Sequence, residues 1–260
     1  MINTKVIKVS CCGANELLNV ENVVDFLESN PQVEIGIGVS RERCSVGMPR
    51  FSWILDLQSR LSPEKGMSRI AFHVNGNWSK EIVENGTLPE ELFYLLWRNK
   101  GIVRIQLNVI GSGHTFDNIS VKPLADLITE LSEKQIGRFI IPANKESFAF
   151  IKKLQTLTDE FDVLYDASFG FGKKAEKYLS LFPQQLQGYA GGLSGDNIQE
   201  ELLKIDKAQT APTQIWVDAE GRLKNDNVNT LDLNKAKRFA DNAFAMNNEL
   251  SLSMQQEKSI

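Results

Sequence analysis

The sequence has few of the residues on which disulfide-bonded and metal-binding folds depend. It contains three cysteines and two histidines among 260 residues. Cys11 and Cys12 are adjacent and cannot easily bridge each other, and Cys44 makes the number odd, so no disulfide framework is expected. His73 and His114 show no metal-ligand spacing relative to these cysteines. The sequence therefore predicts a protein with reduced thiols and no bound metal.

Long apolar runs and an excess of positive charge are also missing. No stretch approaches the roughly 18 apolar residues that a membrane span requires. Residues 1–13 lead directly into a strand-like run without the pattern of a secretory signal, so a cytoplasmic location is expected. The net charge of -4 gives no basic field for nucleic acid. These absences argue against a membrane or nucleic acid as a partner.

Two kinds of segment alternate along the chain: short β-branched apolar runs, and longer runs with apolar residues at helical spacing. The predicted strands span residues 6–11, 33–39, 69–74, 102–109, 138–141, 161–166, 187–190 and 213–218. The predicted helices span residues 20–28, 51–60, 79–85, 90–99, 123–134, 147–156, 174–181, 196–203 and 232–245.

This alternation predicts a parallel sheet with right-handed crossovers. Eight such units can close into a (β/α)8 TIM barrel, which typically needs about 250 residues. An open doubly wound sheet is the main alternative, although it usually has fewer strands. We expect a single barrel domain over residues 1–246, followed by a polar, frayed tail over 247–260. Any active site of such a barrel lies on the loops that follow the strands.

Two residues at predicted strand ends could transfer protons. Cys12 could act as an acid or base if its pKa were near neutral, or it could be a small buried residue that packs in the barrel mouth. Asp166 could be a general acid if burial raises its pKa, or a helix cap or loop hydrogen-bond acceptor. His73 is expected in the core, whereas His114 could be either exposed or functional.

The last two loops of the predicted barrel could bind an anion. Gly191 and Gly192 let the backbone approach a ligand, and the following helix start attracts negative charge. Gly221 and Arg222 in the eighth loop could add close approach and positive charge, whereas Glu220 opposes a phosphate. The alternative is that the paired glycines only make a tight turn.

In order along the chain, several motifs resemble those of phosphoribosylanthranilate isomerases. The matching segments are Cys12-Gly13, Ile70-Ala71-Phe72-His73-Val74-Asn75, Gln106-Leu107, Asp166, Ala190-Gly191-Gly192-Leu193 with Asn197, and Asp218. The chain departs from the family at Ser10, where a lysine is usual, at Asn108-Val109 in place of His-Gly, and in the loop after Asp218.

The resemblance implies an Amadori rearrangement of tryptophan biosynthesis that needs no cofactor. Asp166 would be the general acid that opens the ribose ring, and Cys12 the general base. Gln106 and Asp218 are expected to bind substrate. Arg41 and Arg43 could bind a carboxylate, or could be ordinary solvated charges. The alternatives are a barrel acting on another phosphorylated metabolite, as a lyase or aldolase, and a non-catalytic metabolite-binding relative.

Overall fold

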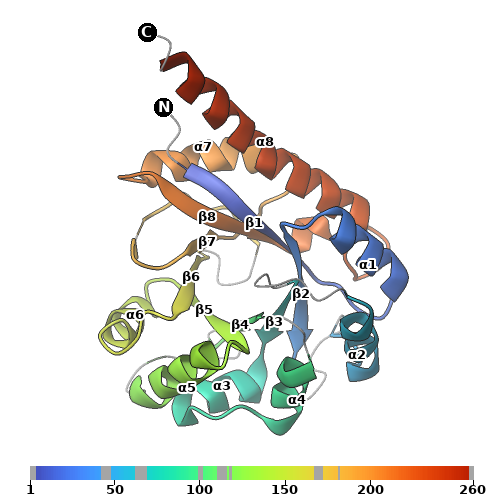
Figure 1. The fold of residues 1–260 in the computed structure, drawn as a ribbon, viewed down its shortest axis with the longest axis vertical. Coiled ribbons are helices and arrows are strands. Elements are labelled where there is room, and N and C mark those ends of the chain that lie inside the picture. Colours follow the sequence, from blue (N-terminus) through green and yellow to red (C-terminus); the bar gives the residue numbers. More distant parts are fainter. Residues whose placement is uncertain are drawn as a thin grey trace.

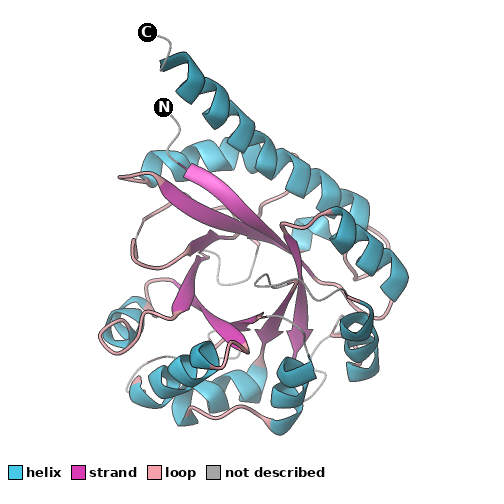
Figure 2. Cartoon of the chain, in the orientation of Figure 1, coloured by secondary structure: helices cyan, strands magenta, loops and turns pink. Residues whose placement is uncertain are grey.

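The computed structural model describes residues 4–41, 48–61, 69–98, 102–109, 116, 119–166, 172–180 and 182–257, with side chains through residue 247. Eight parallel strands close into a barrel in the order β1 to β8, and the helices surround them (Figures 1 and 2). The strands are β1 (Thr4–Cys12), β2 (Val33–Val39), β3 (Ile70–Val74), β4 (Val103–Leu107), β5 (Gly137–Ala143), β6 (Phe161–Tyr165), β7 (Gln187–Tyr189) and β8 (Thr213–Ala219). The predicted (β/α)8 TIM barrel is therefore confirmed.

Most helices begin and end close to the predicted positions, but those predicted to end at residues 203 and 245 continue to residues 208 and 257, and the one predicted over 174–181 is absent from the described residues. The helices are α1 (Val20–Ser29), α2 (Phe51–Arg60), α3 (Gly76–Asn85), α4 (Glu90–Arg98), α5 (Lys122–Glu133), α6 (Phe148–Leu154), α7 (Ile198–Ala208) and α8 (Leu233–Glu257), with the 3-10 turn η2 (Gly221–Leu223) after β8. Among the described residues, no helix is both long enough and apolar enough to cross a bilayer.

Strand β2 shows how the sequence separates the two faces of the barrel wall. Its residues Val-Glu-Ile-Gly-Ile-Gly-Val place the β-branched side chains on one face and Glu34, Gly36 and Gly38 on the other. The β-branched residues belong to the apolar core that includes residues of the surrounding helices. A Cβ atom at Gly36 would meet Cys12 Sγ at 2.2 Å, so the glycine lets side chains of β1 and β3 meet inside the barrel.

The barrel interior is filled by a buried ion network and an aromatic side chain. Arg104 Nη1 donates to Glu34 Oε1 at 2.7 Å, and Arg104 Nη2 lies 3.2 Å from Asp162 Oδ2. The guanidinium also stacks over Trp216, with its Cζ 3.8 Å from the ring centroid. Trp216 packs in turn against Ile140 and neighbouring apolar side chains. These residues form a solid floor beneath the barrel mouth.

The helix predicted over residues 174–181 is absent from the described residues between β6 and β7. Tyrosine hydroxyls take the place of helical amides there. Tyr165 donates to the Lys177 carbonyl at 2.9 Å, and Tyr189 donates to the Leu179 carbonyl at 3.2 Å. Tyr178 is buried, and its hydroxyl donates to Glu201. That prediction was wrong because tertiary hydrogen bonds outweigh local helical periodicity.

The expected frayed tail is helical instead. Helix α8 continues to Glu257, because residues 233–257 contain neither glycine nor proline. Asn247 connects this helix to strand β1, since its side chain accepts a hydrogen bond from the Val6 amide at 3.0 Å and donates one to the Val6 carbonyl at 2.7 Å. The end of α8 extends beyond the barrel (Figure 1).

Candidate active site

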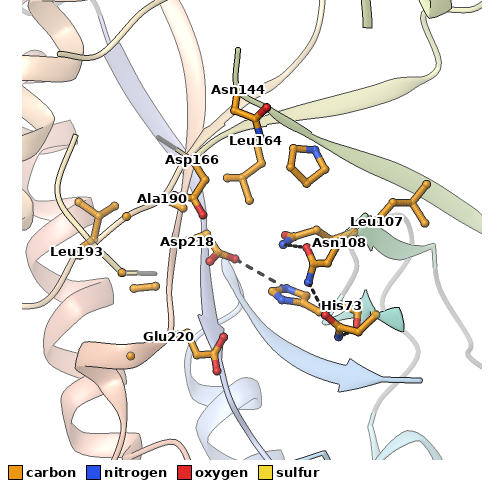
Figure 3. Close-up of a pocket in the computed structure, with 18 of the residues that line it drawn as sticks. His73, Leu107, Asn108, Asn144, Leu164, Asp166, Ala190, Leu193, Asp218 and Glu220 are labelled. Atoms are coloured by element: carbon orange, nitrogen blue, oxygen red, sulfur yellow. Dashed lines mark hydrogen bonds and ion pairs between the residues drawn. The ribbon is translucent and has the colours of Figure 1, made fainter. Parts of the chain in front are cut away.

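A cavity of about 600 Å³ opens at the end of the barrel formed by the carboxyl termini of the strands. Its wall is formed by side chains and loops that follow β3, β4, β5, β6, β7 and β8 (Figure 3). Of the predicted site residues, Asp166, Gly191, Gly192, Gly221, Arg222, Gln106 and Asp218 line it. The cavity is large enough for a small metabolite.

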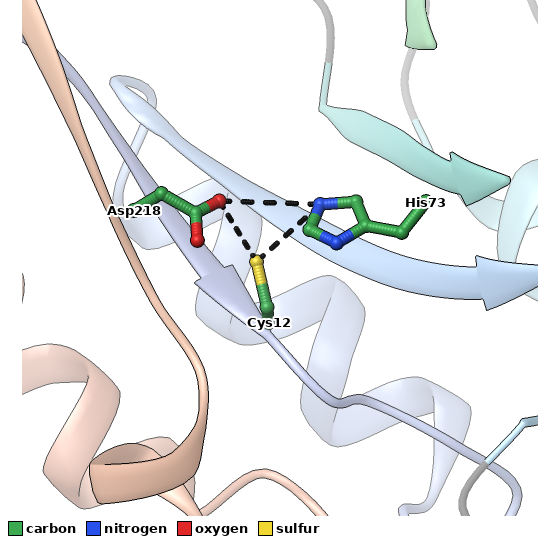
Figure 4. Close-up of side chains that lie close together, drawn as sticks. All are labelled: Cys12, His73 and Asp218. Carbon is green, nitrogen blue, oxygen red and sulfur yellow. Dashed lines mark hydrogen bonds and ion pairs between the residues drawn. The ribbon is translucent and has the colours of Figure 1, made fainter. Parts of the chain in front are cut away.

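Three side chains converge at the floor of this cavity (Figure 4). Cys12 Sγ donates to Asp218 Oδ2 at 3.1 Å and lies 3.6 Å from His73 Nε2. His73 Nε2 lies 3.9 Å from the same Asp218 oxygen. His73 and Asp218 line the cavity, whereas Cys12 is buried beside them and does not. The base expected at the mouth therefore lies one side chain deeper, and Asp218 links it to the cavity.

Burial is the largest influence on the pKa values of Cys12 and Asp218. Burial and the Asp218 charge raise the pKa of the Cys12 thiol well above its usual value. Burial also raises the pKa of Asp218 to about 6, while His73 and the Cys12 hydrogen bond partly oppose that rise. At neutral pH the thiol therefore keeps its proton and donates a hydrogen bond to the Asp218 carboxylate.

Asp166 lies on the cavity wall directly after β6. Its carboxylate is directed into the cavity (Figure 3). A Cβ atom built at Gly191 would lie 3.4 Å from Asp166 Oδ1, which places the carboxylate against the glycine loop after β7. Asp166 and Asp218 thus present carboxylates to one space from two different strands.

A chain of amides forms another part of the wall. Gln106 Nε2 donates to Asn108 Oδ1 at 2.9 Å, and Asn108 Nδ2 donates to Asn75 Oδ1 at 3.1 Å. Asn75 in turn donates to the His73 carbonyl at 2.7 Å. These amides fix one another and can offer both donors and acceptors to a polar ligand.

The paired glycines after β7 adopt a backbone that side chains rarely allow. Gly191 has φ 105° and Gly192 has φ 64°. A Cβ atom at either position would lie 2.7 Å from a backbone carbonyl of the β6–β7 connection, Lys173 for the first and Gly172 for the second. Asn197 braces the loop by donating to the Gly192 carbonyl. The glycines are therefore required for the turn itself, and they also bring backbone to the cavity edge.

The loop after β8 carries both signs of charge to the cavity. Gly221, Arg222, Glu220 and Lys224 all line it. Lys224 Nζ lies 2.8 Å from Glu220 Oε1, and about half of the Glu220 side chain stays exposed. The carboxylate that would oppose a phosphate is thus paired with a neighbouring ammonium group, and the Arg222 guanidinium adds positive charge.

One of the two predicted arginines, Arg41, does not line this cavity. Arg41 is exposed, and its Nη2 lies 2.8 Å from Glu81 Oε2. Neither residue lines the cavity. Arg43 lies outside the described residues, as do Cys44 and His114. The expectation that Arg41 binds a substrate carboxylate gains no support, because its partner is a glutamate on α3.

Sequence reasoning missed the role of His73 in this site. It was expected in the core and is indeed buried, but its ring faces the cavity and meets Cys12 and Asp218. Cys12 and His73 are 61 positions apart in sequence, and Cys12 and Asp218 are 206 apart. No linear spacing could reveal the cluster, although each residue lies at or next to the carboxyl-terminal end of a predicted strand.

The fold and the cavity define a (β/α)8 barrel with ionisable groups at the carboxyl-terminal end of its strands. Its fold is similar to that of phosphoribosylanthranilate isomerase from Thermotoga maritima, with a TM-score of 0.57 and 15% identity over 91% of this chain and 98% of that one. An isomerase structure holding reduced 1-(o-carboxyphenylamino)-1-deoxyribulose 5-phosphate gives 0.54 and 14%, with the same coverage. N-(5'-phosphoribosyl)anthranilate isomerase from Pyrococcus furiosus gives 0.53 and 13%, again over 91% and 98%. No family model and no curated protein sequence matches the chain.

Proposed function

We propose that this protein is an isomerase of a phosphorylated sugar derivative, and that the Amadori rearrangement of phosphoribosylanthranilate in tryptophan biosynthesis is the first reaction to test. One observation carries the proposal. A carboxylate on the wall, Asp166, shares a cavity with the Cys12–His73–Asp218 cluster on its floor. An intramolecular proton shift needs an acid and a base on two sides of one small substrate.

Asp166 supplies the acid in this proposal. The carboxylic acid protonates the ribose ring oxygen, the bond from that oxygen to the anomeric carbon breaks, and a protonated Schiff base forms. The carboxylate lies beside the glycine loop on the cavity wall, where it can reach the ring oxygen of a substrate held in the cavity.

The Cys12–Asp218 pair supplies the base. Asp218 accepts the thiol hydrogen bond and faces the cavity, so the pair can take up the proton from the carbon next to the Schiff base. The resulting enolamine becomes a ketone when it is protonated on its nitrogen-bearing carbon. Every proton removed is returned to the product, so the reaction needs no oxidant, reductant or cofactor.

The glycine loop after β7 and the loop after β8 would bind the phosphate. Gly191, Gly192 and Gly221 bring backbone to the cavity edge, and Arg222 adds a guanidinium. Pairing of Glu220 with Lys224 reduces the repulsion that this glutamate would exert on a dianion. Similarity in fold to phosphoribosylanthranilate isomerases, one of them in complex with a 5-phosphate, supports a phosphorylated ligand for this cavity.

Rescue of a tryptophan auxotroph that lacks this isomerase tests the proposal. The wild-type chain should restore growth without tryptophan, and Asp166→Asn should not, at equal protein levels. Failure of the wild-type chain to restore growth, with soluble protein present in the cells, would remove this substrate. The remaining alternatives would then be a reaction on another phosphorylated metabolite, or metabolite binding without catalysis.

A further inference from the structure

Cys12, His73 and Asp218 point three different donor atoms at one place. The distances are 3.1 Å from Sγ to Oδ2, 3.6 Å from Sγ to Nε2 and 3.9 Å from Nε2 to Oδ2. All three residues are buried. Thiolate, imidazole and carboxylate are the three side-chain types that bind zinc in proteins.

The triangle has the size that a metal ion requires. A point about 2.1 Å from all three atoms lies within it, close to the Zn–N and Zn–O distances of about 2.0–2.2 Å and a little short of the Zn–S distance of about 2.3 Å. An ion slightly above the plane meets all three distances with small adjustments of the side chains. Gly36 provides the room, because a Cβ there would lie 2.2 Å from Sγ and 2.9 Å from Nε2.

The same geometry does not suit a nucleophilic relay. In a thiol–imidazole–carboxylate relay, one ring nitrogen binds the thiol and the other binds the carboxylate. Here the single nitrogen Nε2 is the atom near both Cys12 and Asp218. Convergence of three donors on one point is the arrangement of a metal site instead.

We propose that Cys12, His73 and Asp218 bind one divalent transition-metal ion, with Zn²⁺ the best-matched species, and that its remaining coordination position faces the cavity. The thiolate excludes Mg²⁺ and Ca²⁺, which prefer oxygen ligands. Binding releases the thiol proton to solvent, and the ion neutralises the buried thiolate and carboxylate.

The metal site does not depend on the proposed isomerase reaction. Its ligands include both members of the proposed base, so a bound ion removes the thiol and the carboxylate from proton transfer. Stoichiometric Zn²⁺ should therefore inhibit any isomerase activity, and a chelator should restore it. Metal binding itself is read from a spectrum, so a failed isomerase assay and a failed metal site give different results.

Cobalt titration of the full chain tests the proposal. The background protein carries Cys11→Ala and Cys44→Ser, so that Cys12 is the single remaining thiol. Cys11 is a matched partner, because it is also buried but its Sγ lies 3.9 Å from the Ala236 carbonyl, away from the cluster. We expect one equivalent of Co²⁺ to give a thiolate-to-cobalt charge-transfer band and the visible bands of a tetrahedral ion.

Two further variants attribute that signal. Cys12→Ser should abolish the charge-transfer band while circular dichroism shows an intact fold. His73→Gln should keep a thiolate but weaken Co²⁺ affinity by at least about tenfold, as loss of even an outer-shell partner can do. Absence of the band in the background protein, or its persistence in Cys12→Ser, would overturn the site.

Discussion

The contact of Gly36 with the cluster makes a sharp prediction about one methyl group. Gly36→Ala places a Cβ atom 2.2 Å from Cys12 Sγ and 2.9 Å from His73 Nε2. Ordinary contacts between heavy atoms lie at about 3.5–4.0 Å, so the overlap exceeds an ångström. Strand β2 pairs with β1 and β3 at this residue, so the backbone cannot move aside. The thiol or the imidazole must leave its place.

Two opposing effects set the change in the free energy of unfolding that Gly36→Ala should cause. Overpacking of a core costs up to about 3 kcal/mol, whereas Gly→Ala gains up to about 1 kcal/mol by restricting the unfolded chain. Gly36→Ala should therefore lower the free energy of unfolding by about 2 kcal/mol. Gly38→Ala is the matched control on the same strand and face, because its Cβ meets Met48 at 3.4 Å and Asn75 at 4.0 Å. That variant should be neutral or slightly stabilised.

Urea unfolding and calorimetry of the two variants check this difference. We expect Gly36→Ala to melt about 4–8 °C below the wild type, given about 2–4 °C per kcal/mol for a domain of this size. It should also lose the cobalt charge-transfer band, and Gly38→Ala should keep it. Equal stability of the two variants would refute the placement of Cys12 and His73 beside Gly36.

Three further predictions concern the buried network and the mouth. Arg104→Leu leaves two buried carboxylates without their shared partner and should cost about 3–5 kcal/mol in urea unfolding, whereas Arg60→Leu removes an exposed pair and should cost under about 1 kcal/mol; similar costs would contradict the network. Burial raises the pKa of Glu34, but Arg104, Lys8 and the Ser10 hydroxyl outweigh burial and hold the pKa below its ordinary 4.5. The ionised Glu34 therefore stabilises the fold fully above pH 4.5, and this contribution is lost as the pH falls below that value. Glu34→Gln should flatten the fall in urea midpoint that the wild type shows at acidic pH. Arg222→Ala should weaken inorganic phosphate binding about three- to tenfold in calorimetric titration and Glu220→Ser should strengthen it, and unchanged affinity in both would argue against a phosphate site at η2.

Much of the barrel could be predicted because most strands are short, local runs of apolar residues. β2 and α2 have the predicted bounds, since alternation and helical spacing are unambiguous there. The β6–β7 connection could not be predicted, because its conformation depends on hydroxyl groups of Tyr165 and Tyr189, which lie outside the segment. Continuation of α8 through Glu257 follows from the absence of glycine and proline after residue 233. The polar composition of residues 247–260 had predicted a frayed tail instead.

The site was predictable in position but not in composition. Asp166, Asp218 and the glycines after β7 line the cavity, because strand ends of a parallel barrel meet at one rim. The cluster could not be read from spacing, since Cys12 and His73 become neighbours only when the strands pair and close. Small residues such as Gly36 were the available signal, because a glycine inside a strand marks close approach.

In the proposed reaction, Asp166 acts on the substrate from the wall of this cavity, and Cys12 acts through Asp218 on the floor. Steady-state turnover of phosphoribosylanthranilate, measured with chelator present, tests this claim most directly. We predict that Asp166→Asn and Cys12→Ala each lower kcat by about 10²-fold or more, the scale of general acid–base groups. Cys11→Ala, which alters the opposite face of β1, should change kcat only slightly. Equal losses at Cys11 and Cys12, or no turnover by the wild-type protein, would contradict the claim.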